Sequence, residues 1–148
     1  MTATDIAVRD PRTCLPERTW ERLVRLIMRD HGLDHELAER TAGQTVAYLV
    51  TSAENPEITM GPTPAVDKGV HTFVLDSPRY FAFCDQHAGH YIHHVPHLPE
   101  DETGDTGLVK RTIAAIRAAG FPVDAELWRA ESADCNQCYN GCSDSPEK

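Results

Sequence analysis

The sequence contains no apolar run long enough to cross a membrane, and its first residues, MTATDIAVRDPRTC, lack the charged start and apolar core of a signal peptide. Basic residues are scarce, with 14 lysines and arginines against 23 acidic residues and a formal net charge of -9. A nucleic-acid surface needs a concentrated basic footprint, so nucleic acid and membrane are not expected partners. We expect a cytoplasmic protein whose partner, a protein or a small molecule, the sequence does not identify.

Several common catalytic motifs are also missing. The sequence has no G-x-x-x-x-G-K-[ST] phosphate loop, no G-x-G-x-x-G after a strand and no G-x-S-x-G elbow, so nucleotide, dinucleotide and serine-hydrolase chemistry lack their usual marks. Alternation of apolar and polar residues is confined to HTFVL and HYIHHV, which disfavours a β-rich fold.

Helical periodicity dominates the rest of the chain, which at 148 residues has the size of one domain. Apolar residues recur at helical spacing, between capping residues, prolines and glycines, in five stretches: 16–31, 34–52, 64–75, 78–88 and 106–119. A short turn carrying Trp128 follows. These patterns predict an all-α fold of about five helices in one compact domain, residues 16–130, with an N-terminal arm (1–15) and a cysteine-rich tail (131–148).

The histidines gather in one stretch, HYIHHVPH, which holds four of the eight in the chain. Imidazole is the commonest side-chain metal ligand, and an extended chain here would place Ile92 and His94 on one side and His93 on the other. His93 and His94 are therefore the candidate ligands, with His90 and His97 as further choices. A polar loop with solvated rings is the alternative interpretation.

Two pairs on the preceding helices have ligand spacing. Asp67 and His71 are four residues apart, so the carboxylate can accept the ring N–H of a histidine whose other nitrogen binds metal. Cys84 lies three residues before His87 and is a candidate ligand. The alternatives are a helix-surface contact for Asp67 and His71, and core packing for Cys84.

Three cysteines, Cys135, Cys138 and Cys142, form a C-x2-C-x3-C pattern near the C-terminus. Thiolates at this spacing are typical zinc ligands, and metal binding would give a polar segment with no apolar stripe a reason to fold. A fourth ligand has to come from elsewhere, and a histidine between 90 and 94 is the expected supplier. His71, Cys84 and His94 are the candidates for a second cluster.

Residues 66 to 96 contain an ordered series of motif positions: Val66, Asp67, His71, Tyr80, Phe83, Cys84, Gly89, Tyr91, Ile92, His93, His94 and Pro96. The series resembles the small bacterial relatives of the glycine-rich domain proteins, whose plant members carry a domain of unknown function. The resemblance implies a mostly helical domain in which His71, Cys84 and His94 are motif positions, and it implies no reaction. Val70 replaces the family's tryptophan, and Phe73 replaces a second histidine of the plant members, which removes one candidate ligand.

The first functional hypothesis is a metal-binding protein with a structural or accessory role, zinc being the expected ion and copper or iron the alternatives. The second is a metal-dependent tailoring enzyme that uses a mixed His/Cys site with an open coordination position. The third is a thiol redox partner that works through a reversible disulfide in the tail. The sequence leaves open whether the protein is an enzyme.

Overall fold

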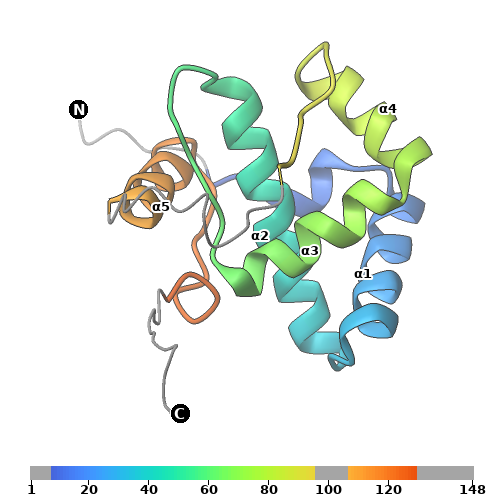
Figure 1. Ribbon diagram of the computed structural model, residues 1–148. Helices are drawn as coiled ribbons and strands as arrows, with labels where there is room; N and C mark the ends of the chain where they lie inside the picture. Colours follow the sequence, from blue (N-terminus) through green and yellow to red (C-terminus); the bar gives the residue numbers. More distant parts are fainter. Residues whose placement is uncertain (1–7, 96–106, 130–148) are drawn as a thin grey trace.

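The computed structural model describes residues 8–95 and 107–129 (Figure 1). Within these ranges it has five α-helices, one 3-10 turn and no strand, which confirms the predicted fold class. The elements are η1 (Pro11–Cys14), α1 (Glu17–His31), α2 (His35–Glu54), α3 (Pro64–Leu75), α4 (Ser77–His87) and α5 (Leu108–Ala118). None of the helices in the described ranges combines the length and apolar character needed to cross a bilayer.

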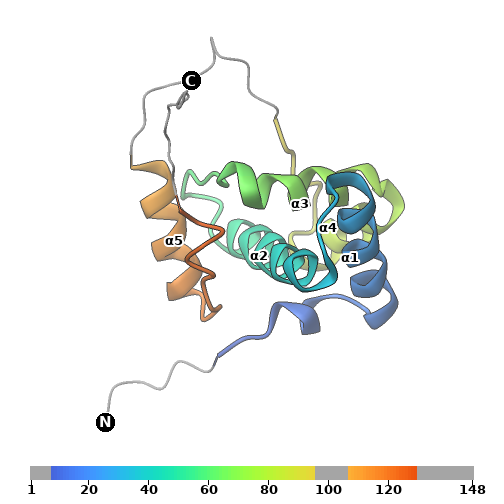
Figure 2. The ribbon, with the colours of Figure 1, turned by 90° about the horizontal axis from the view of Figure 1, so that it is seen from below.

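Helix α2 is the centre of the fold. It packs against α1, α3, α4, α5 and η1, and Figure 2 shows the other helices arranged around it. Its buried residues lie on all faces, among them Ala38, Ala42, Val46 and Val50, which are fully buried. Every residue from Gln44 to Thr51 is buried, so this part of α2 lies inside the domain, whereas α1 buries only one stripe of residues, beginning with Trp20.

Helix boundaries follow local chemistry. The carboxylate of Asp34 accepts a hydrogen bond from the Leu37 N–H at the start of α2, and Gly32 ends α1 with a left-handed φ of 66°. At the start of α4, Ser77 is already helical and Asp76 takes the position before it. The Asp76 side chain makes no capping bond there; its carboxylate pairs with Arg22 instead.

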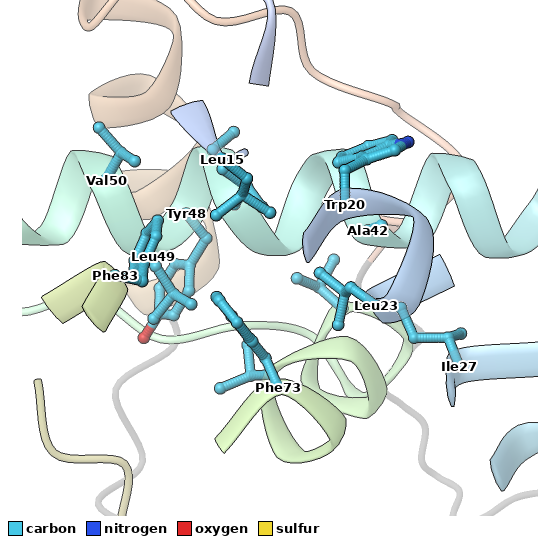
Figure 3. Close-up of a cluster of buried hydrophobic side chains, with 14 of the residues drawn as sticks. Leu15, Trp20, Leu23, Ile27, Ala42, Tyr48, Leu49, Val50, Phe73 and Phe83 are labelled. Carbon is cyan, nitrogen blue, oxygen red and sulfur yellow. The ribbon is translucent and has the colours of Figure 1, made fainter. Parts of the chain in front are cut away.

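The core is gathered along α2. Figure 3 shows Leu23 and Ile27 of α1, Phe73 of α3 and Phe83 of α4 converging on this helix. Phe73 makes edge contacts with the rings of Tyr80 and Phe83, both at 5.2 Å between centroids. These contacts fix α3 and α4 relative to each other, which determines where the segment after α4 begins.

The described part of the N-terminal arm packs on the domain. The Arg9 guanidinium donates to both carboxylate oxygens of Glu54, at 3.0 Å each, and to the Ala119 carbonyl. It also lies 4.3 Å from the centre of the Phe121 ring. Arg9 thereby ties the arm to the ends of α2 and α5.

Candidate metal centre

Helix α3 supplies the first two residues of the site. Thr63 caps this helix through its hydroxyl, Pro64 occupies the first turn, and the helix then runs without interruption past His71. Residues four apart share a face, and the His71 Nδ1 atom lies 3.0 Å from Oδ2 of Asp67. This carboxylate favours a proton on Nδ1, which leaves the His71 Nε2 lone pair free to bind a metal.

The segment after α4 is held to that helix by its backbone. Gly89, with φ of 74°, turns the chain after α4. The Tyr80 hydroxyl then donates to the Ile92 carbonyl, and the Ile92 N–H donates to Cys84 Sγ at 3.3 Å. Burial raises the pKa of the Tyr80 hydroxyl, so it stays protonated and able to donate. Tyr80 and Cys84 therefore position residue 92 and, through it, the next two histidines.

His94 completes the cluster from this segment. Its Nε2 atom lies 3.2 Å from His71 Nε2 and 2.9 Å from Asp67 Oδ1, and the two imidazole rings meet edge to face at 4.6 Å. The His94 side chain is 14 % exposed, whereas that of His71 is 47 % exposed. The cluster is therefore closed on the His94 side and open to solvent at His71.

His93 lies on the other side of the segment. It is exposed, and its ring contacts Tyr91 at 5.0 Å, outside the Asp67 cluster. The extended backbone predicted from the sequence accounts for this, because successive side chains then point to opposite sides. Residues 90–93 line a hollow of about 360 Å³ together with the end of α2 and Pro56; the lining residues are Ser52, Ala53, Pro56, His90, Tyr91, Ile92 and His93.

One carboxylate oxygen in the cluster has no hydrogen bond. Asp67 Oδ1 is fully buried and makes no hydrogen bond, although His94 Nε2 lies 2.9 Å from it and a protonated His94 would form an ion pair with it. A buried polar atom without a partner costs about 1–3 kcal/mol, and more when it is charged. The Asp67 carboxylate also acts on the buried Tyr48, whose pKa is raised to about 12 by burial first and by this negative charge second.

The three side chains have the spacing of ligands around one cation. One ligand atom from each of Asp67, His71 and His94 lies within 4.8 Å of the others. Two nitrogens bound to a tetrahedral zinc ion at its usual bond length are about 3.3 Å apart, close to the 3.2 Å between the two Nε2 atoms. Without a cation, only one hydrogen fits between these nitrogens, so the two rings cannot both carry a proton on Nε2.

The structure brings together some of the residues predicted from the sequence and separates others. His71 and His94 meet, with Asp67 between them as a prospective ligand in addition to its predicted supporting role. Cys84 is 1 % exposed and accepts a hydrogen bond from the Ile92 N–H. Both Cys84 and His93 lie outside the cluster. Cys135, Cys138, Cys142 and His97 lie outside the described residues. Sequence reasoning missed the role of Tyr80, although Tyr80 is one of the motif positions and lies one turn before Cys84.

Comparison with known proteins adds no relative. No protein-family model, no curated protein and no solved structure matches this chain.

Proposed function

We propose that this protein binds one divalent transition-metal ion between Asp67, His71 and His94, with zinc as the preferred ion. The observation that carries the proposal is the buried Oδ1 of Asp67, a carboxylate oxygen without a hydrogen bond beside two imidazole nitrogens. A cation among these three atoms would satisfy the oxygen and would replace the hydrogen bond between the two facing nitrogens with two metal–nitrogen bonds.

The donor set narrows the choice of metal. Two imidazole nitrogens and one carboxylate oxygen suit zinc, iron and copper better than magnesium or calcium, which prefer oxygen ligands. The resemblance noted in the sequence is in keeping with this, because His71 and His94 are both motif positions. The role we propose is a binding or accessory one in the cytoplasm.

A metal-dependent enzyme is the second candidate, and one observation favours it. Two histidines and one carboxylate are also the ligands of mononuclear iron enzymes that keep open positions for substrate. In that case the solvent-facing side of the cluster, at His71, would admit the substrate. Four protein ligands around the metal would argue for the accessory role, and three ligands with an exchangeable water would argue for the enzyme.

The test uses two neighbouring histidines as a matched pair. His94→Ala removes a proposed ligand, whereas His93→Ala removes an exposed ring that makes no contact with Asp67 or His71. Zinc affinity is measured on the full-length chain by competition with a chromophoric chelator. Since loss of supporting residues alone costs 10–100-fold in affinity, we expect His94→Ala to weaken zinc binding by at least about 100-fold and His93→Ala to change it by less than about threefold.

A second pair tests the carboxylate. Asp67→Asn keeps the shape of the side chain but removes its charge, and it should weaken zinc binding as His94→Ala does. Glu57, an exposed acid outside the cluster, provides the control as Glu57→Gln. Equal zinc affinity in the His93 and His94 variants, or in the Asp67 and Glu57 variants, would contradict the proposed site.

A further inference from the structure

Helix α1 presents a row of arginines to solvent. One side of this helix is buried against the core. At 3.6 residues per turn, the positions directly opposite that side lie within about 60° of one another around the helix axis. All of them are exposed arginines: Arg18, Arg22, Arg25 and Arg29. We call this row the arginine ridge; it extends about 16 Å along α1.

The arginine ridge contrasts with the acidic character of the chain. The sequence has only 14 lysines and arginines and a formal net charge of -9. Figures 1 and 2 both place α1 at the edge of the molecule, with α2 between it and α5. Within the part of the chain that the structure describes, Arg22 pairs with Asp76 and Arg29 with Asp30, whereas Arg18 and Arg25 form no ion pair. Two guanidinium groups of the ridge are thus available to carboxylates from outside.

One flank of the ridge is held in place and carries apolar side chains. The Asp76 carboxylate, which is 9 % exposed, accepts hydrogen bonds from Arg22 at 2.9 Å and from Arg79 at 3.1 Å. This fixes Arg22 against the junction of α3 and α4. Leu75, just before Asp76, is 81 % exposed, and Leu26, one turn after Arg22, is half-buried. Arginine beside apolar side chains is a composition typical of protein–protein interfaces.

Acidic residues border the ridge and limit what can bind to it. Glu17 and Glu21 lie on the flank of α1 next to Arg18, and Asp30 lies beside Arg29. A broad polyanion, such as a nucleic acid or an anionic bilayer, would bring its charges against these carboxylates. A single helix aligned with α1 is narrow enough to meet the ridge alone.

The spacing of the ridge matches the carboxylates that such a helix can offer. Acidic residues at positions i, i+4, i+7 and i+11 share one helix face and repeat the spacing of the four arginines. Guanidinium groups bind carboxylates through paired hydrogen bonds, which gives these contacts a defined geometry.

We propose that the arginine ridge docks an acidic helix of a partner protein, which aligns with α1 and pairs its carboxylates with the four arginines. Leu26 and Leu75 supply apolar contacts beside these pairs. The surface shares no residue with Asp67, His71 and His94, so the inference does not depend on the proposed function.

Fluorescence anisotropy with two labelled peptides and the full-length chain tests the inference. Each peptide is an alanine-based helix of about 20 residues with four glutamates. The first peptide has them at i, i+4, i+7 and i+11, and the second has them distributed around the helix. The test variant is Arg18→Gln/Arg25→Gln. Lys110→Gln/Arg117→Gln is the matched control, because it removes two exposed positive charges from α5 and leaves the ridge intact.

We expect the wild type to bind the first peptide about tenfold more tightly than the second. Arg18→Gln/Arg25→Gln should weaken binding of the first peptide about tenfold through the loss of two exposed ion pairs, and the α5 control should bind like the wild type. Raising the salt concentration should weaken binding, because it screens exposed charges.

Several outcomes would overturn the inference. Equal affinity of the ridge variant and the α5 control for the first peptide excludes the ridge as the binding surface, as does a wild type that binds neither peptide. Equal affinity of the wild type for the two peptides refutes alignment with a helix. A single-stranded oligonucleotide or phosphatidylserine vesicles that bind the wild type more tightly than the first peptide, and lose affinity in the ridge variant, would assign the ridge to nucleic acid or lipid.

Discussion

Replacing Gly69 by alanine should destabilise the protein, although alanine is the better helix former. A Cβ atom at Gly69 would lie 1.9 Å from Thr45 Oγ1 and 3.1 Å from Thr45 Cβ, far inside contact distance. Thr45 is fully buried, and its hydroxyl donates to the Thr41 carbonyl at 2.8 Å, so it cannot turn away without losing that bond. Helix α3 would have to move away from α2.

The expected magnitude follows from two opposing effects. Overpacking a close contact costs about 1–3 kcal/mol or more, and the Gly-to-Ala gain in helix propensity returns about 1 kcal/mol. Because the contact of 1.9 Å is so short, we take the upper end of the overpacking cost, about 3 kcal/mol. The net loss in the free energy of unfolding is then about 2 kcal/mol, or about 4–8 °C in Tm for a chain of this size. Urea denaturation followed by circular dichroism measures the free energy, and a thermal scan measures Tm.

Gly43 provides the matched control, since a Cβ there would meet only Trp20 Cη2 at 3.9 Å and Pro11 Cγ at 4.0 Å. Gly43→Ala should therefore stabilise the protein by about 0.5–1 kcal/mol. Thr45→Ala removes the oxygen that Gly69→Ala would strike, so the cost of Gly69→Ala should fall by about 1 kcal/mol or more in that background. If Gly69→Ala is stabilising, or costs the same with and without the Thr45 hydroxyl, the close-contact argument is refuted.

Three further predictions concern the loop, the pH dependence and the metal. Tyr80→Phe leaves the Ile92 carbonyl without its donor, so it should lower the free energy of unfolding in urea by about 1–2 kcal/mol. It should also weaken zinc binding, because His94 follows Ile92 by two residues. Unchanged zinc affinity would show that Tyr80 does not position His94. A hydrogen bond from Arg40 holds the pKa of Asp124 below its ordinary value, so this pair stabilises the fold above the unfolded pKa of about 4 and loses that effect as the pH falls through the lowered value. Arg40→Gln should therefore destabilise the protein at pH 7 and progressively less below about pH 4. A stability difference that stays constant from pH 7 to pH 2 would contradict this. Zinc at 100 times its Kd should raise the free energy of unfolding by about 2.7 kcal/mol, reversibly with a chelator, and a Tm independent of zinc would oppose binding to the folded state.

Local patterns in the sequence were sufficient to predict the helices and the pairing of Asp67 with His71. Capping residues and apolar spacing act within a few residues, which is why α1 and α3 were placed correctly. The meeting of His94 with His71 is a tertiary contact across 23 positions, and it depends on how α3 and α4 pack. Spacing alone could not decide that Cys84 faces the core and bonds to a backbone N–H, since ligand and core cysteines share the same pattern.

The Thr63 hydroxyl, which caps α3, also donates to the Leu127 carbonyl at 2.6 Å, and this bond bears on the order of assembly during synthesis. Leu127 lies 64 residues after Thr63, so the N-cap of α3 acquires this partner only after those residues have been made. Chains are synthesised at about 5–20 residues per second, so Thr63 spends several seconds without this partner. The contact that fixes the first turn of α3 therefore forms late, and loading of the proposed metal site on this helix would follow it.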